Sequence, residues 1–251
     1  MYSKIKILYK QLHFNLFLYL FLVKVFEKTL SIVLFVKHFT YKNSFSQGGE
    51  DIILNHLFKN KSNGFFIDIG CNHPIESNNT FNLYTKGWRG LNIDGNNSLI
   101  NLYPKFRPND ISLCQIISDT EKFVTFYISK SNKVSTIDET FYKDNNNAFE
   151  YNSDDFIKLP SIRLDKILKN TDVDTKNIDL LTIDVEGHDI NVLLSLDLNI
   201  IRPKVICIED HQINIKELET SNIYNYLIEK RYKLKYYAIS SCFYIDENYN
   251  V

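Results

Sequence analysis

Short apolar runs recur along the chain, and an acidic residue closes each of them. The runs end at Asp68, Asp94, Asp119, Asp184 and Glu209. Asp68 and Asp94 are 26 positions apart, and the next interval, like that from Asp184 to Glu209, is 25. This is the length of one strand–helix unit, so the pattern predicts an α/β fold with a parallel sheet and helices on both faces. The five acids should then lie along one edge of that sheet, where the strands end.

The run Phe65–Ile69 leads into a turn with a single glycine, Gly70. It lacks the G-x-G-x-x-G pattern that allows a backbone to close around a pyrophosphate. The carboxylate of Asp68, near the end of this strand, would repel a phosphate and attract a positive charge. The turn therefore predicts a cofactor with a cationic centre and no phosphate, which describes S-adenosylmethionine. A nucleotide-dependent oxidoreductase or sugar-modifying enzyme on a Rossmann-like sheet is the competing interpretation, and the missing glycines count against it.

Two further strand ends are candidates for cofactor contacts. Asp94 follows the first strand at the distance that places a carboxylate on a ribose in nucleotide-binding α/β folds. A simple helix cap is the alternative role for this residue. Ser118 and Asp119 follow the third expected strand, Leu113–Ile117, and are placed to meet an adenine amine.

The remaining pattern predicts the following elements. Helices are expected at 47–59 with Ser46 as the N-cap, after the cap-like cluster 77–80 as far as Lys86, at 96–106, through Leu168, after the turn 185–189 as far as Leu196, and at 223–230; strands are expected at 123–128, 134–137, 178–184 and 204–209, with a closing hairpin at 232–239 and 242–245. The segment 143–155 is polar and rich in asparagine, which predicts a mobile loop or lid that helps to choose the substrate.

Residues 1–40 differ from the rest and form a separate N-terminal region ahead of a domain at 41–251. They are rich in Leu, Phe and Val, but the longest apolar stretch, 14–23, is about half a membrane span. On a helical projection the basic and polar residues share one arc, which predicts an amphipathic basic helix. Two interpretations stay open: peripheral contact with a membrane surface, or packing on the protein's own domain or on a second subunit of a homo-oligomer. A spanning anchor ranks third.

Composition narrows the function further. The formal net charge is −1, and no motif supplies a basic groove, so the sequence predicts no nucleic-acid partner. The four cysteines show no C-x-x-C spacing, which predicts reduced thiols in a cytoplasmic protein rather than disulfides or a zinc site.

Several motifs together resemble FkbM-type methyltransferases, from about Ser46 to the C-terminus. The matching segments are 46–51, 66–74, 87–90 with Asp94, and 183–187 followed by Arg202, Pro203 and Glu209. The resemblance implies a class I methyltransferase fold: a Rossmann-like, doubly wound, mostly parallel seven-stranded sheet that ends in an antiparallel hairpin. It also implies S-adenosylmethionine-dependent O-methylation of a hydroxyl of a sugar, a polysaccharide or a related natural product.

The resemblance also implies roles for individual residues. By carry-over, Asp68, Gly70 and Asn72 form the cofactor loop, Asp94 binds the ribose and Asp119 faces the adenine. The chain departs from the family pattern at 92–96, where Asn-Ile-Asp-Gly-Asn replaces a frequent Glu-Pro. Aspartate is shorter than glutamate, so the ribose contact is the less secure of these assignments.

The catalytic candidates are Asp184, Glu186 and His211, which cluster with Glu209 at the ends of the fourth and fifth expected strands. A hydroxyl is a poor nucleophile, so a base within hydrogen-bonding reach is useful. Asp184 is favoured by topology, because the fourth strand is expected to flank the first strand, where the cofactor would lie, and His211 is favoured by an ordinary pKa near neutrality. Their spacing is no zinc signature, so no metal ligands are assigned; a divalent metal held by several carboxylates is the less favoured option. The alternative function is a catalytically silent methyltransferase fold that acts as a binding or scaffold protein at a membrane surface.

Overall fold

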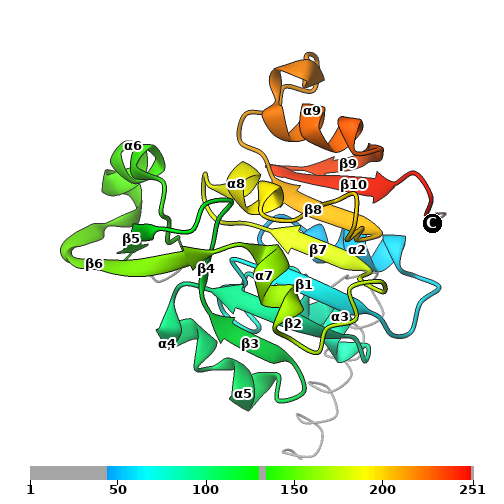
Figure 1. Cartoon of the computed structure of the whole chain (residues 1–251), viewed down its shortest axis with the longest axis horizontal. Coiled ribbons are helices and arrows are strands. Elements are labelled where there is room, and N and C mark those ends of the chain that lie inside the picture. Colours follow the sequence, from blue (N-terminus) through cyan, green and yellow to red (C-terminus); the bar gives the residue numbers. More distant parts are fainter. Residues whose placement is uncertain (1–43, 130–133, 250–251) are drawn as a thin grey trace, which may run out of the picture. The chain divides into compact units, whose positions relative to one another are not determined.

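The computed structural model describes residues 44–129 and 134–249, which fold around a seven-stranded sheet (Figure 1). The predictions made for residues 1–40 lie outside the described ranges. Strand order in the sheet is β3-β2-β1-β7-β8-β10-β9. The strands are β1 (Phe65–Ile69), β2 (Arg89–Asp94), β3 (Ile111–Cys114), β7 (Leu180–Ile183), β8 (Val205–Glu209), β9 (Tyr232–Ala238) and β10 (Ser241–Asp246).

The first five strands in this order are parallel, and the last two make the antiparallel hairpin. In register, Ile67 of β1 lies between Leu91 of β2 and Leu181 of β7. The predicted fold is therefore confirmed: a mostly parallel, Rossmann-like sheet ending in an antiparallel hairpin. The prediction that the strand of Asp184 flanks the first strand is confirmed as well.

Helices cover both faces of the sheet. They are α2 (Glu50–Leu57), α3 (Phe81–Thr85), α4 (Asn97–Ile100), α5 (Tyr103–Phe106), α7 (Leu164–Lys169), α8 (Asp189–Leu194) and α9 (Asn222–Glu229), with a 3₁₀ turn at Leu218–Thr220. A further helix, α6 (Glu139–Phe149), lies apart from the main sheet (Figure 1). A second sheet, with strand order β4-β6-β5, consists of β4 (Ile116–Ile117), β5 (Phe123–Ser129) and β6 (Tyr151–Ile162).

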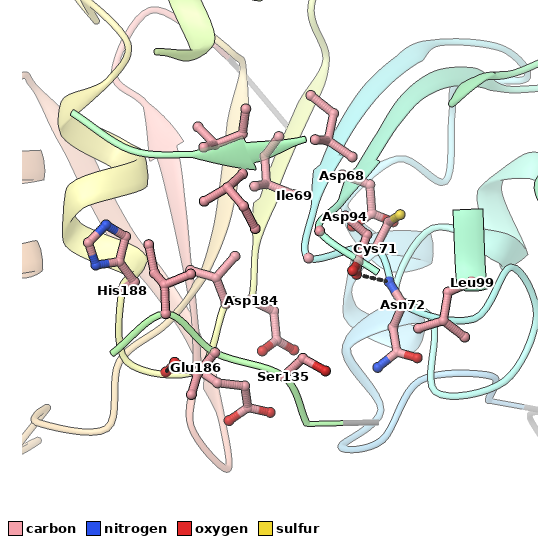
Figure 2. Close-up of a pocket in the computed structure, with 18 of the residues that line it drawn as sticks. Asp68, Ile69, Cys71, Asn72, Asp94, Leu99, Ser135, Asp184, Glu186 and His188 are labelled. Carbon is pink, nitrogen blue, oxygen red and sulfur yellow. Dashed lines mark hydrogen bonds between the residues drawn. The ribbon is translucent and has the colours of Figure 1, made fainter. Parts of the chain in front are cut away.

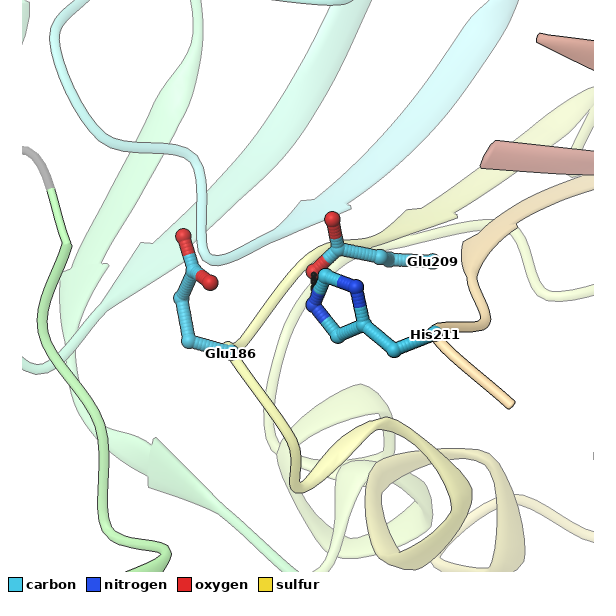
Figure 3. A group of neighbouring side chains, drawn as sticks. All are labelled: Glu186, Glu209 and His211. Atoms are coloured by element: carbon cyan, nitrogen blue, oxygen red, sulfur yellow. Dashed lines mark ion pairs between the residues drawn. The ribbon is translucent and has the colours of Figure 1, made fainter. Parts of the chain in front are cut away.

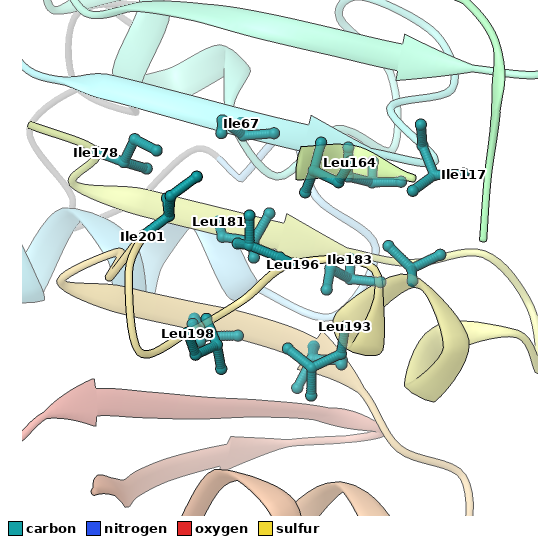
Figure 4. Packing of buried hydrophobic residues seen from close by; sticks show 14 of the residues in the cluster. Ile67, Ile117, Leu164, Ile178, Leu181, Ile183, Leu193, Leu196, Leu198 and Ile201 are labelled. Atoms are coloured by element: carbon teal, nitrogen blue, oxygen red, sulfur yellow. The ribbon is translucent and has the colours of Figure 1, made fainter. Parts of the chain in front are cut away.

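Alternation along the strands builds a core on each face of the main sheet. In β1, Ile67 and Ile69 belong to the larger cluster, which α7, α8 and α9 cover, whereas Phe66 belongs to the cluster under α2 and α3. The same period of two recurs in β7, β8 and β10, because successive side chains point to opposite faces. Figure 4 shows the larger cluster packed between strands and helices, with Leu181 and Ile183 of β7 at its centre. Burial on both faces explains why the strands are unbroken apolar runs.

The third expected strand is not one strand. The chain pairs with β2 over Ile111–Cys114, leaves the main sheet at Gln115, and continues as β4 beside β6. Consequently, Asp119 follows a strand of the small sheet, and the prediction of five acids on one edge is correct for four. Gln115 is the one polar residue in the run 113–117, and a single polar position does not by itself predict a change of sheet.

The prediction of a mobile loop at 143–155 is wrong. It comprises most of α6 and the start of β6. The side chain of Asp138 caps the helix by accepting from the backbone N–H of Phe141 at 2.7 Å. Tyr142 then stacks on Tyr127 of β5, with ring centroids 4.3 Å apart. An N-cap and an aromatic contact with a distant strand therefore outweigh the low helix propensity of the asparagines.

Two predicted helices differ in their limits. The helix expected from residue 47 begins at Glu50 with Gly49 as its N-cap, in a left-handed conformation (φ 86°). Ser46, the predicted cap, still accepts from the backbone N–H of Asp51 at 3.2 Å. The helix expected at 96–106 is divided into α4 and α5. Across the described part of the chain, no helix has the length and apolar character needed to cross a membrane.

Candidate active site

A pocket opens at the carboxyl ends of β1, β2 and β7, and we call it the main pocket (Figure 2). It encloses about 920 Å³, part of which is open to solvent. Asn72, Asp94 and Leu99 gather on one side of it, and Glu186 and His188 lie on the other (Figure 2). This volume is typical of sites for small molecules.

The Gly70 turn forms the floor of the main pocket. Gly70 has φ 75°, and a Cβ atom there would lie 1.8 Å from the backbone oxygen of Asp184. No larger residue fits, because the loops after β1 and β7 touch at this point. The glycine singled out in the sequence therefore brings the first strand close to Asp184.

Asp94 connects the end of β2 to the loop after β1. Its carboxylate accepts from the backbone N–H of Asn72 at 3.0 Å (Figure 2) and from that of Asn96 at 2.7 Å. Burial raises the pKa of this carboxyl above its ordinary value, and the two backbone hydrogen bonds oppose the shift. Asp94 thus holds the loop after β1 to the chain before α4, whose N-cap is Asn96, and it lines the main pocket; its predicted contact with the ribose stays a prediction.

Asp68 is buried, and sequence reasoning missed the groups that surround it. Thr80 donates its hydroxyl to the Asp68 carboxylate at 2.7 Å. Arg107, also fully buried, donates to Thr80 Oγ1 at 2.9 Å and to the side-chain oxygen of Asn78 at 2.5 Å. Burial raises the pKa of Asp68 to about 6, against the lowering effects of Thr80 and Arg107. Nothing in the local pattern around Arg107 marks it as a partner of a strand 39 positions earlier.

We expect Thr80→Val to destabilise the protein by about 1–2 kcal/mol, because it leaves the buried Asp68 carboxylate without its hydroxyl donor. The folded-state pKa of Asp68 is raised, so this group's stabilising contribution is full below its ordinary value of 3.8 and is lost as pH rises through about 6. The substitution should raise that pKa further and destabilise more at pH 8 than at pH 5. Urea unfolding at both pH values measures this. Thr85→Val, an exposed change in the same helix, should cost less than about 0.5 kcal/mol, and equal losses from the two variants would contradict the account.

The second group of acids lies where β7 and β8 end. Asp184 is within hydrogen-bonding reach of the Glu209 carboxylate, and burial, then the charge of Glu209, raises its pKa well above the ordinary value. Ser240 donates to Glu209 at 2.8 Å. Burial is the largest single effect and raises the pKa of Glu209, but the bond to His211, the charge of His211 and the bonds to Ser240 and Asp184 together leave the value lowered. Of these two carboxyls, Asp184 is therefore the one that holds its proton to higher pH, and it faces Glu209 as a donor, which makes it a weaker candidate for the base.

His211 and Glu186 complete the group (Figure 3). His211 Nε2 lies 3.0 Å from a Glu209 carboxylate oxygen, and this bond raises the pKa of His211 to about 9. Burial, followed by repulsion from Glu209, raises the pKa of Glu186 to about 8. Figure 3 shows Glu186 facing this ion pair from the loop after β7. One ligand atom from each of the three lies within 4.8 Å of the others, a spacing that a divalent cation could bridge. The absence of an assigned metal thus stays a prediction.

Ser118 and Asp119 are not brought into the main pocket. Ser118 is buried, and its hydroxyl lies 3.0 Å from His188 Nε2. Asp119 accepts from the side chain of Asn191 at 3.2 Å. The residues just before them, Gln115 and Ile116–Ile117 of β4, line the main pocket instead. The adenine contact of Ser118 and Asp119 stays a prediction that their position does not support.

The turn of Glu186 and Gly187, after β7, is held in place by the segment that precedes α6 and by α6 itself. Thr136 donates its hydroxyl to the backbone oxygen of Glu186 at 2.7 Å. Glu186 and Gly187 are both left-handed (φ 56° and 95°), and a Cβ atom on Gly187 would lie 3.2 Å from Phe141 of α6. Phe141 also stacks against His211, with ring centroids 6.0 Å apart. The predicted acids are thus fixed by contacts with an element that was expected to be a loop.

The residues of the main pocket fit S-adenosylmethionine. The carboxyl groups of Asp68 and Asp94 suit its positive charges, and no phosphate-binding loop is present among the described residues. Apolar side chains provide a bed for an aromatic base; these are Ile93, Leu99, Ile116, Ile117 and Phe126. The fit supports the predicted roles of Asp68, Gly70, Asn72 and Asp94 around this cofactor.

The comparison with protein families agrees with this geometry. The family described as Methyltransferase FkbM domain matches residues 68–234, which is 167 of the 251 residues. The matched region begins in β1 and ends in β9, so it contains the whole main pocket apart from Gln47. A comparison with curated proteins found no match.

Proposed function

The chain belongs to the family of FkbM methyltransferase domains, and we propose that it is an O-methyltransferase whose acceptor is a hydroxyl of a sugar, a polysaccharide or a related natural product. Members of methyltransferase families generally use S-adenosylmethionine, which supplies a methyl group on a cationic sulfur. Transfer to oxygen would require a hydroxyl to lose its proton while its oxygen bonds to the methyl carbon and the bond from that carbon to sulfur breaks, with the neutral thioether as the leaving group. The side chains beside the main pocket suit that requirement.

One observation carries the proposal: a group of interacting acids and one histidine lies at the wall of the main pocket. Among its members, Glu186 lines the pocket and has a pKa of about 8, within reach of neutral pH. We assign Glu186 as the group that accepts the hydroxyl proton. The Glu209–His211 ion pair fixes the charge beside it, since His211 is protonated below about pH 9.

The other two catalytic candidates take supporting roles in this proposal. Asp184 donates its proton toward Glu209 and orients that carboxylate, so it acts by positioning rather than by taking a proton. His211 holds Glu209 and bears the positive charge of the group. Asp94 and the Gly70 turn hold the cofactor against this wall, which provides the proximity that a displacement at carbon needs.

The experiment that tests the proposal uses S-adenosylmethionine with a ¹³C-labelled methyl group and a panel of methyl glycosides. The expected product is a glycoside with a new ¹³C-labelled O-methyl group, detected by NMR. Label that appears on nitrogen or carbon of added amines or phenyl rings, and never on a hydroxyl, would contradict the assignment of oxygen as the acceptor while leaving methyl transfer itself in place.

A further inference from the structure

A second pocket, which we call the side pocket, lies next to the turn of Glu186 and Gly187. It is formed by the loops after β7 and β8 and by the start of α9, and it encloses about 480 Å³, part of which is open to solvent. Its polar lining includes Asp189, Glu209, Asp210, His211, Gln212 and Asn222. This volume suits a small molecule, and the lining offers mainly hydrogen-bond acceptors.

One turn separates the two pockets. Glu186 lines the main pocket, and the next residue, Gly187, lines the side pocket. Glu209 and His211, which line the side pocket, have ligand atoms within 4.8 Å of Glu186. A ring that lies in the side pocket could therefore extend one hydroxyl past Glu209 and His211 to the proposed base, Glu186, at the edge of the main pocket, where the methyl group would lie.

The charges around the side pocket are one-sided. Asp189, Glu209 and Asp210 line it, and because burial raises the pKa of Asp189 to about 7, this carboxyl is only partly ionised at neutral pH. His211 is the only one of the lining residues that can carry a positive charge, and it is paired with Glu209. Asp189 and Asp210 already accept backbone or hydroxyl donors, from Gly187 at 3.1 Å and from Ser221 at 2.5 Å, so they stay in place as fixed acceptors. An anionic ligand would meet several carboxylates without a free cation in this lining.

We propose that the side pocket is the acceptor site and that it takes an uncharged or amine-bearing hydroxylated ring while excluding acidic sugars. This proposal rests on the proposed function, because it places the acceptor hydroxyl of that reaction. The carboxylates accept hydrogen bonds from ring hydroxyls or an ammonium group, and the same carboxylates repel a ring carboxylate or phosphate.

Saturation-transfer NMR on the full chain, in the presence of excess S-adenosylhomocysteine, tests the proposal. The three matched probes are methyl glucoside, methyl glucosaminide and methyl glucuronide. We expect the glucoside and the glucosaminide to bind, and the glucuronide to bind about tenfold more weakly or not at all, which corresponds to about 1.4 kcal/mol. A glucuronide that binds as well as the other two would overturn the exclusion of acidic sugars. If S-adenosylhomocysteine binds and none of the three glycosides does, the acceptor assignment is overturned.

A charge variant localises the effect. Gln212 is exposed at the side pocket and has no part in the proposed chemistry, so Gln212→Arg should strengthen binding of the glucuronide relative to the glucoside by about tenfold. Asn199→Arg makes the same change of charge at an exposed position outside both pockets and should leave that ratio unchanged. Equal effects of the two variants would show that net charge, and not the side pocket, decides the ratio, which would overturn the proposal.

The samples also separate this proposal from the proposed function. Failure of the acceptor assignment leaves binding of S-adenosylhomocysteine intact and abolishes only the glycoside signals. If neither S-adenosylhomocysteine nor any glycoside binds to a folded chain, the proposed function itself is contradicted.

Discussion

Glu186→Gln is expected to lower kcat by about 10²- to 10⁴-fold, the range associated with a general base. The substitution keeps the size of the side chain and removes the carboxylate that accepts the proton. Because Glu186 lies at the wall of the main pocket, away from Asp94, the affinity for S-adenosylhomocysteine should change by less than about threefold. Steady-state kinetics and calorimetry measure the two effects. Glu229→Gln, on the exposed side of α9, is the matched control and should leave both unchanged.

The pH dependence provides an independent check on Glu186. Its basic form is present above its pKa of about 8, so the wild-type rate should rise as pH increases toward that value. His211 loses its proton above about 9, which should lower the rate again if its positive charge is required. The apparent pKa values belong to the interacting group rather than to single residues. A kcat within tenfold of wild type in Glu186→Gln, or an unchanged profile in that variant, would exclude Glu186 as the base.

Asp94→Asn is expected to weaken binding of S-adenosylhomocysteine by about 30- to 100-fold. An ionised carboxylate accepts from two ribose hydroxyls in charge-assisted bonds, and the amide can replace only one of its oxygens. The amide nitrogen would also face the backbone N–H of Asn72 or Asn96, which loosens the loop. Calorimetric titration measures the change.

Asp119→Asn is the matched control for that variant. Asp119 lies outside the main pocket, bonded to Asn191, so we expect its substitution to change the affinity by less than about twofold. If instead Asp119→Asn weakens binding as strongly as Asp94→Asn, then the adenine contact expected from the sequence exists and the position of Asp119 in this structure does not represent the bound form.

Much of the fold could be predicted from the sequence because burial imposes a simple pattern. Strands covered on both faces are largely apolar, as in Leu180–Ile183 with Thr182 as its one polar residue, and the spacing of the strand–helix units indicates parallel strands. The carboxyl ends of parallel strands lie at one edge, so the placement of Asp94, Asp184 and Glu209 along the same edge followed from topology alone. The Gly70 turn was recognisable because only a glycine fits there.

Contacts between distant segments could not be predicted in the same way. Arg107 reaches Thr80 and Asn78 through a buried network for which the sequence has no periodic sign. The relative pKa values of Asp184, Glu186 and Glu209 depend on the ion pair between His211 and Glu209, which the sequence does not show. For this reason the sequence favoured Asp184 as the base, whereas our proposal assigns Glu186. The change of sheet after Cys114, which removes Asp119 from the edge, likewise follows from pairing with a strand that comes 35 or more residues later.

Titration of the purified, full-length wild-type chain with S-adenosylhomocysteine tests the central claim most directly, because it asks whether the main pocket holds the cofactor. We predict one site per chain with a dissociation constant in the micromolar range, which corresponds to about −8 kcal/mol. A chain that unfolds cooperatively yet gives no binding heat at several temperatures would contradict the account. That outcome would return the chain to the alternative of a methyltransferase fold kept for binding or scaffolding.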